Sequence, residues 1–145
     1  NRPIPGAKSI DYIRAILVLA EAREKAAIEA VYVDSGGWVR EGTTSNIFAI
    51  FGGTLVTPGE GILSGITRQK VLGLAEGNCT VQIRDIQRGE LVAADEVFIT
   101  SSNRLIVPIV QVDEDRIGTG KPGERTRALM QTFAEYTARL SATHE

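Results

Sequence analysis

The sequence predicts a mixed α/β domain in which largely antiparallel strands are flanked by helices. Its 145 residues are enough for one domain with a sizeable hydrophobic core. Short runs that alternate apolar and polar residues are separated by glycine-bearing turns, as in a β-meander. Longer stretches with helical periodicity stand near the start, the middle and the end of the chain. Together these patterns favour the α/β class over an all-helical or all-β domain.

The first third of the chain predicts a helix followed by a meander. Residues 1–7 have the composition of an extended segment. From Asp11, a plausible helix N-cap, apolar residues recur at helical spacing. The expected apolar stripe of this helix consists of Ile13, Ile16, Leu17 and Ala20. Strands are expected at residues 30–34, at 38–51 with an interruption near 42–46, and at 54–58, with a hairpin turn at 35–37.

The rest of the chain predicts alternating helices and strands. A loop at 59–65 precedes a helix that Gly77 ends. Pro108 within an apolar run indicates an edge strand or a bulge, because proline cannot donate a ladder hydrogen bond. Further strands are expected at 80–86, 97–102 and 106–113, and further helices at 88–96 and 124–140. The inner face of the last helix should carry Leu129, Met130, Phe133, Tyr136, Thr137 and Leu140.

Composition disfavours several classes of function. The net charge is −2 and no basic tract occurs, so we expect no nucleic-acid partner. The apolar runs are much shorter than a membrane span, so we expect no membrane partner. The single histidine, His144, stands next to the end of the chain, which disfavours Ser-His-Asp, Cys-His and histidine-built metal sites. The single cysteine, Cys79, excludes an internal disulfide and favours a cytoplasmic location.

Glu41 begins the stretch "EGTTSNIFAIFGG", in which a carboxylate directly precedes small hydroxyl residues and an apolar strand. On this stretch alone two interpretations stay open. The carboxylate is either a solvated charge at a strand end or a group placed to hold something cationic, and the first kind is the more common.

Two further segments have the composition of anion-binding loops. In "LSGITRQ", Gly65, Ile66 and Thr67 stand where a helix begins, and the backbone N–H groups of a first helical turn favour negative charge. In "FITSSNR", Ser101 and Ser102 directly follow a strand, where small hydroxyl groups suit the oxygens of a phosphate. An ordinary helix cap and an ordinary turn are the common alternatives.

Lys8 precedes the first helix, where a lysine is usually a solvated surface charge. Its amine can also form a Schiff base with an aldehyde cofactor when burial or a cationic neighbour lowers its pKa. Because histidine chemistry is disfavoured, an enzyme built on this chain would rely on Lys, Asp, Glu, Tyr or hydroxyl groups together with a bound cofactor.

Taken in order, these segments resemble the fold-type IV pyridoxal-phosphate enzymes, also called class IV aminotransferases. That family includes branched-chain aminotransferases, D-amino acid aminotransferases and aminodeoxychorismate lyase. The matching motifs are "KSIDY" from Lys8, "EGTTSNIF" from Glu41, "GILSGITR" from Gly61 and "VFITSSNRLIVPI" from Val97. The resemblance covers essentially the whole chain, and it implies the large C-terminal pseudo-barrel domain of the D-amino acid aminotransferase-like fold.

The resemblance also implies pyridoxal 5'-phosphate as the cofactor, with a role for each motif. Lys8 would hold the cofactor covalently and move the α-proton of the substrate, and Glu41 would keep the pyridine nitrogen protonated. The remaining expected cofactor-binding residues are Gly65, Ile66 and Thr67 on one side of the phosphate, Ser101 and Ser102 on its other side, and Thr44, Ser45 and Asn46 along the face or edge of the cofactor.

The activity implied by the resemblance is transfer of an amino group between an α-amino acid and a 2-keto acid, by an enzyme that is a homodimer. Two alternatives stay open: a lyase of the aminodeoxychorismate type, and a structural domain that no longer uses the cofactor. Family members carry a smaller domain before the lysine. Residues 1–145 are therefore expected to be the cofactor-binding domain without that smaller domain, and to be inactive alone.

Overall fold

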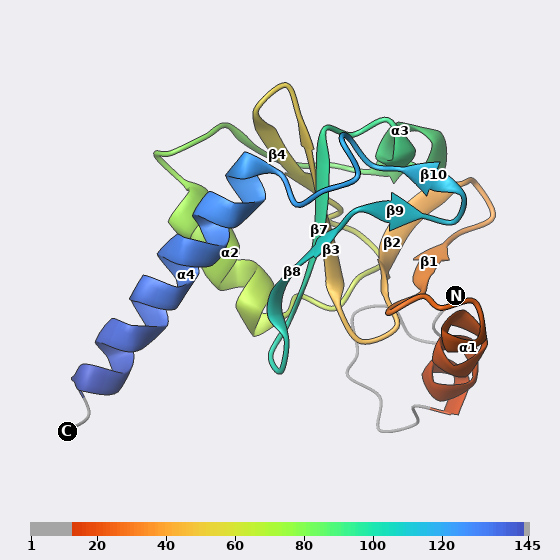
Figure 1. Cartoon of the computed structure of the whole chain (residues 1–145), viewed down its shortest axis with the longest axis horizontal. Coiled ribbons are helices and arrows are strands. Elements are labelled where there is room, and N and C mark those ends of the chain that lie inside the picture. Colours follow the sequence, from red (N-terminus) through yellow and green to blue (C-terminus); the bar gives the residue numbers. More distant parts are fainter. Residues whose placement is uncertain (1–12, 144–145) are drawn as a thin grey trace.

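The structure is a computed structural model, and it describes residues 13–143. The segment expected to be extended, Lys8, Asp11 and His144 lie outside the described residues. The described elements follow in the order α1 (Ile13–Glu24), β1 (Val31–Val33), β2 (Trp38–Gly42), β3 (Asn46–Phe51), β4 (Thr54–Thr57), α2 (Ile66–Ala75), β5 (Val81–Ile83), β6 (Ile86–Gln87), α3 (Arg88–Val92), β7 (Glu96–Ser101), β8 (Leu105–Ile109), β9 (Gln111–Val112), β10 (Asp115–Arg116) and α4 (Glu124–Ala142) (Figure 1).

A five-stranded sheet with the order β5-β4-β3-β7-β8 forms the centre of the molecule. Its middle strand, β3, is antiparallel to both β4 and β7, and the register places Phe48 opposite Phe98. All residues of β3 except Phe51 are buried, and after Asn46 the strand is a continuous apolar run rather than an alternating one. The rings of Phe48 and Phe98 stack with their centroids 4.8 Å apart.

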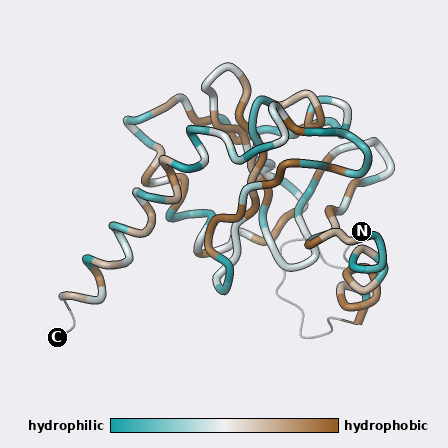
Figure 2. The backbone as a smooth tube through the Cα atoms, viewed as in Figure 1, coloured by the Kyte–Doolittle hydropathy of each residue, from teal (hydrophilic) through white to brown (hydrophobic). Residues whose placement is uncertain are grey.

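Hydrophobic residues pack against both faces of this sheet, and hydrophobic stretches of the backbone run through its strands (Figure 2). On one face, Phe48 and Phe98 pack with Val71 of α2 and Phe133 of α4. The second hydrophobic cluster joins the sheet to β2, β6 and α3. The domain is therefore layered, with helices α2 and α4 on one side of the sheet and a small sheet, β1-β2-β6, on the other.

Most of the predicted elements are confirmed. The meander is present, and its predicted interruption separates the end of β2 at Gly42 from the start of β3 at Asn46. Gly77, with a φ of +82°, follows α2, as expected for a helix stop. Pro108 lies on β8, the edge strand of the large sheet, where its missing N–H does no harm.

Two strand predictions are wrong in extent. Residues 80–86 form two strands in different sheets: β5 pairs with β4, whereas β6 pairs with β2. Residues 106–113 likewise divide into β8 and β9, and β9 pairs with β10, which the sequence pattern did not predict. An alternating pattern identifies extended backbone, but it does not reveal at which residue the chain leaves one sheet for another.

The apolar stripes of the terminal helices are only partly covered. In α1 no described residue is buried, and Ile16 and Leu17 are 62% and 65% exposed. In α4, Phe133 is buried but Met130 and Leu140 are 37% and 45% exposed. The two helices lie at opposite ends of the molecule (Figure 1). Periodicity predicted both helices correctly, but burial of a stripe depends on the elements that pack against it.

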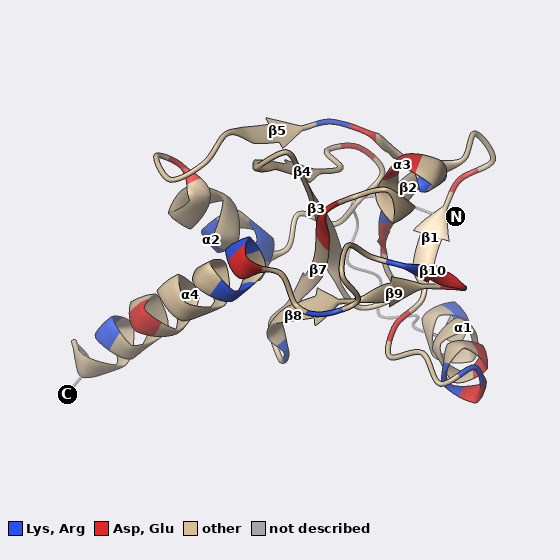
Figure 3. Cartoon of the chain, turned by 45° about the horizontal axis from the view of Figure 1, so that its top comes forward, with Lys and Arg blue, Asp and Glu red and all other residues tan. Residues whose placement is uncertain are grey.

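Charges of both signs are interspersed along α1 and α4 (Figure 3). Within residues 13–143, no helix has the length and apolar character that crossing a membrane requires.

Candidate active site

The carboxylate of Glu41 is buried at the end of β2. The residue is only 2% exposed, and its Oε2 accepts a hydrogen bond of 3.0 Å from the backbone N–H of Leu63. Leu63 belongs to the loop that leads into α2. The solvated interpretation of Glu41 is therefore wrong, because this carboxylate is withdrawn from water and bonded to a loop residue 22 positions away.

Asn46, the first residue of β3, binds the same loop at two points. Its Nδ2 donates to the carbonyl of Leu63 at 2.6 Å, and its Oδ1 accepts from the N–H of Gly65 at 3.2 Å. One amide side chain is thus hydrogen-bonded to the loop residues on either side of Ser64. The predicted role of Asn46 along the cofactor stays a prediction, while its contacts in the structure hold the residues that lead into α2.

Gly65 is the N-cap residue of α2, with extended backbone (φ −67°, ψ 147°) and no side-chain cap. A Cβ atom built at this position would stand 2.4 Å from Oδ1 of Asn46, so glycine is what allows the close approach. The first turn of α2 contains no acidic residue. The N–H groups of a first turn, here those of Ile66 and Thr67, have no acceptor within the helix, and together with the helix dipole they favour an anion.

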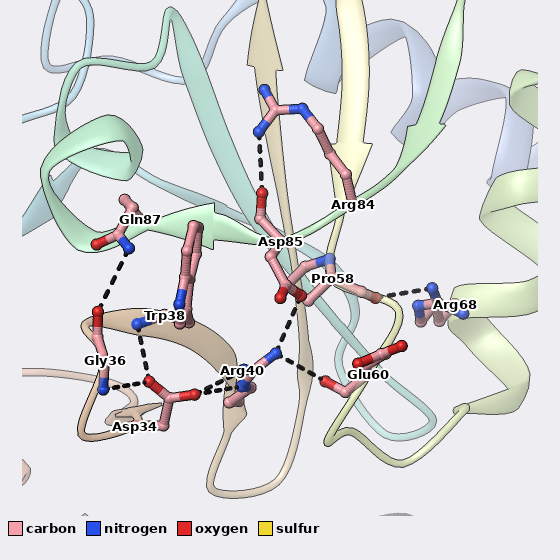
Figure 4. A network of polar contacts seen from close by, with 10 residues as sticks. All are labelled: Asp34, Gly36, Trp38, Arg40, Pro58, Glu60, Arg68, Arg84, Asp85 and Gln87. Atoms are coloured by element: carbon pink, nitrogen blue, oxygen red, sulfur yellow. Dashed lines mark hydrogen bonds and ion pairs between the residues drawn. The ribbon is translucent and has the colours of Figure 1, made fainter.

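Two arginines fix the start of the same loop (Figure 4). Nη1 of Arg40 donates to the carbonyl of Glu60 at 3.3 Å while the guanidinium pairs with Asp34 and Asp85 at 2.6 and 3.0 Å. The hydrogen bond from Arg40 holds the pKa of Asp34 below its usual value. Arg68 of α2 is 5% exposed and donates to the carbonyl of Pro58 at 2.9 Å. The loop is thus held along its length from Pro58 to Gly65.

Ser101 and Ser102 lie where β7 ends. Antiparallel pairing places Thr100 opposite Asn46. The C-terminal end of β7 therefore lies beside the N-terminal end of β3, at the same end of these strands. The hydroxyl of Ser101 donates to Oδ1 of Asn103 at 3.0 Å and accepts from the N–H of Arg104 at 3.3 Å. Ser102 is exposed in the turn that follows. Both serines are therefore near the predicted site through the sheet register, within an ordinary hydrogen-bonded turn.

Thr44 and Ser45 belong to a turn that wraps around a carboxylate which the sequence reasoning missed. Glu29 has a side chain only 3% exposed. It accepts from Oγ1 of Thr44 at 3.1 Å and from Oγ of Ser45 at 2.9 Å, and Thr43 donates to it through both its N–H and its hydroxyl. At the interruption between β2 and β3, the N–H of Gly42 donates to the carbonyl of Ser45 at 2.8 Å, and the turn so closed surrounds Glu29. The available signal was an acidic residue inside the apolar run "AAIEAVYV".

Arg104 completes this cluster from the turn after β7. Its Nη2 lies 2.6 Å from Oε2 of Glu29 and 3.0 Å from Oγ1 of Thr44. Burial raises the pKa of Glu29, but hydrogen bonds from Thr43, Arg104 and Ser45 act in the opposite direction and hold that pKa below its usual value. Glu29 is therefore an ionised carboxylate at neutral pH.

The predicted residues among those described lie near one end of strands β3 and β7, where two sets of contacts connect them. One set joins Glu41, Asn46 and Gly65, and the other joins Thr44 and Ser45 to the turn that carries Ser101 and Ser102. Lys8 lies outside the described residues, so its predicted place is untested. Over residues 13–143 no group of three or more His, Cys, Asp or Glu side chains is arranged to hold a metal ion.

Comparison with known proteins identifies relatives along almost the whole chain. The chain is 38% identical over 126 residues to a probable branched-chain-amino-acid aminotransferase of Aquifex aeolicus, covering 84% of this chain and 40% of that protein. It is 35% identical over 139 residues to the D-alanine aminotransferase of Bacillus licheniformis, covering 91% of this chain and 49% of that protein. The chain thus spans less than half the length of either relative.

Solved structures show the same fold. The PLP form of the branched-chain amino acid aminotransferase from Thermobaculum terrenum superposes with a TM-score of 0.87 at 33% identity, over 93% of this chain and 46% of that one. The branched-chain amino acid aminotransferase from Escherichia coli superposes with a TM-score of 0.85 at 34% identity, over 92% and 46% of the two chains. The family model for amino-transferase class IV matches residues 1–112. This chain therefore belongs to the class IV aminotransferase family.

Proposed function

We propose that this chain is the cofactor-binding domain of a pyridoxal-phosphate-dependent aminotransferase that moves an amino group between an α-amino acid and a 2-keto acid. The observation that carries the proposal is that a buried carboxylate, Glu41, and the N-terminus of α2 are fixed to one another by a single loop. A carboxylate suits a protonated ring nitrogen, and a helix N-terminus suits a phosphate. The two ends of one cofactor would thus meet groups of the opposite charge.

The chemistry of the described residues suits pyridoxal phosphate. The amides of Ile66 and Thr67, after the glycine at position 65, would hold the phosphate. Ser101 and Ser102 would close its other side, and Thr44, Ser45 and Asn46 would line the ring. The hydroxyls of Thr44 and Ser45 already donate to Glu29, so toward a ligand they can only accept a hydrogen bond.

The roles proposed for the protein groups follow from their charge and burial. When bound, pyridoxal phosphate supplies an electron-withdrawing ring that makes the α-proton of an amino acid easier to remove. Glu41, buried and bonded to Leu63, would hold a proton at the ring nitrogen without rotating away. Lys8 would carry the cofactor covalently and move the proton at the α-carbon of the substrate.

Further parts of the proposal follow from the relatives' names and lengths. Branched-chain and D-alanine aminotransferases among the relatives favour transamination over the lyase alternative, and they leave the handedness of the substrate as a question for assay. We propose that the complete enzyme is a cytoplasmic homodimer and that this domain alone has little activity, because positioning of the substrate would be incomplete.

The first test concerns Lys8. Borohydride reduction of the cofactor-loaded full-length enzyme should leave a pyridoxyl mass on the peptide that contains Lys8, measured by mass spectrometry after digestion. In the full-length enzyme, Lys8→Ala should lose turnover because the amine that moves the α-proton is gone. Label found only on another lysine, such as Lys25 or Lys70, would contradict the assignment.

The second test removes the charge of Glu41 while keeping its size. In the full-length enzyme, Glu41→Gln should lower kcat by roughly two to three orders of magnitude, about 2.7–4 kcal/mol, the usual scale for one positioned electrostatic contact. Glu96→Gln is the matched control, since Glu96 is a carboxylate that accepts N–H bonds from Arg125 and Thr126 at the start of α4, outside the site. Steady-state kinetics should show an unchanged kcat for the control, and an unchanged kcat for Glu41→Gln would refute the role.

The third test concerns the start of α2. In Gly65→Ala the new methyl group would collide with Oδ1 of Asn46, so the loop must shift and the affinity for pyridoxal phosphate should fall about tenfold or more. Gly73→Ala in the same helix is the control, because a Cβ there meets nothing within 4 Å. Titration of apoprotein with the cofactor, followed by absorbance, measures both. Equal affinities in the two variants would show that the phosphate is held elsewhere.

A further inference from the structure

Glu29 is a buried carboxylate with many hydrogen-bond donors around it, and no role proposed above uses it. It belongs to no strand or helix, and it lies two positions before the start of β1. Its Oε1 accepts from the N–H of Ala30 at 3.0 Å and from Thr43, and its Oε2 accepts from Thr44, Ser45 and Arg104. The side chain of Glu29 is only 3% exposed, and such donors offset the cost of withdrawing its charge from water.

Several residues that contact Glu29 lie in the sequence between Glu41 and Asn46, the two residues whose side chains bind the loop that leads into α2. Glu41 and Asn46 are separated by four residues, and three of those four donate to Glu29. The fourth, Gly42, leaves room for the carboxylate, because a Cβ there would stand 3.1 Å from its Cδ and 2.1 Å from Oγ of Ser45. The turn between Glu41 and Asn46 is closed by the backbone bond from the N–H of Gly42 to the carbonyl of Ser45 at 2.8 Å, and its side chains are directed toward Glu29.

Arg104 connects the same cluster to the other side of the site. It follows Ser101 and Ser102 in the turn after β7, and its guanidinium bonds Glu29, Thr44 and the carbonyl of Ile28. The ion pair thus ties the turn before β3 to the turn after β7. These are the two turns that carry the predicted ring-lining and phosphate-closing residues.

We propose that Glu29, through its pair with Arg104, is a positioning residue that fixes the Thr43–Ser45 turn and thereby sets Glu41 and Asn46 for cofactor binding. This inference rests on the proposed function, since it explains how the same site is held. Glu29 itself touches neither cofactor nor substrate in this account. It acts by fixing the direction of three hydroxyl groups and the spacing of two buried side chains.

Glu29→Gln is a sharp test because it preserves shape and changes only charge and hydrogen-bond character. In either amide orientation, one carboxylate acceptor becomes an NH₂ donor that faces donors of the turn or the guanidinium of Arg104. We expect the dissociation constant for pyridoxal phosphate to rise about tenfold or more, because a buried donor left facing another donor forces the turn to rearrange. The dissociation constant is measured by titrating the full-length protein with pyridoxal phosphate.

Glu90→Gln is the matched control for a purely structural loss. Glu90 of α3 pairs at 2.5 Å with Arg84, which follows β5, in a contact that includes none of the site residues. We expect the control to change the dissociation constant by less than about twofold, since distant, independent contacts do not couple. An equal loss of affinity in both variants, or wild-type affinity in Glu29→Gln, would overturn the proposal.

Two further readouts separate this inference from the proposed function. The amide of Thr43 donates both to the carbonyl of Ala30 at 2.9 Å and to Oε1 of Glu29 at 3.2 Å. If Glu29 fixes the turn, hydrogen exchange at this amide should be faster in Glu29→Gln than in wild type even without cofactor, because a loosened turn breaks both bonds more often, and unchanged exchange would refute the positioning role. Arg104→Ala should lower cofactor affinity, and combining it with Glu29→Gln should cost less than the sum of the two, whereas additive losses would contradict a shared unit. A wild-type protein that binds no pyridoxal phosphate would instead refute the proposed function.

Discussion

The arrangement of the site depends on the two hydrogen bonds between the side chain of Asn46 and the backbone of Leu63 and Gly65. A single amide supplies one donor and one acceptor to two residues of the same loop, at 2.6 and 3.2 Å. Because Leu63 also donates to Glu41, the loop carries the buried carboxylate and the N-terminus of α2 as one unit. Strand β3 is buried along almost its whole length at the centre of the sheet. Its contacts therefore fix the position of a loop that has no regular structure of its own.

Burial explains why these polar contacts hold. Glu41, Asn46 and Arg68 are each at most 6% exposed, and a buried polar group that loses its partner pays the full cost of leaving water. Burial likewise lowers the pKa of the Arg68 guanidinium, because a charged group is less favoured away from water. Contacts of this kind stabilise the folded state only modestly. They do raise the free energy of alternative loop positions, because a displaced loop would leave buried polar groups without partners. A cofactor site requires its groups to be positioned this precisely.

Local signals in the sequence were enough to predict the parts of the fold that depend on neighbouring residues. Glycine at position 77 ended α2, Pro108 fell on an edge strand, and the strand break near Gly42 to Asn46 appeared where it was expected. The motifs around Glu41 and Gly65 led to the family, but their contacts with one another through Leu63 could not be foreseen from spacing alone. Glu29 was missed because its partners lie 14 to 16 and 75 positions away, where only the folded chain brings them together. The division of residues 80–86 between two sheets and the exposure of the α1 stripe escaped prediction for the same reason.

The most direct test of this account is a crystal structure of the protein with pyridoxal phosphate bound. The account predicts that the ring nitrogen lies within hydrogen-bond distance of the carboxylate of Glu41 and that the phosphate accepts from the N–H groups of Ile66 and Thr67. In that structure Asn46 should keep both of its bonds to the loop. A phosphate bound away from the start of α2, or a ring nitrogen that faces a residue other than Glu41, would contradict the central claim that one loop sets both ends of the site.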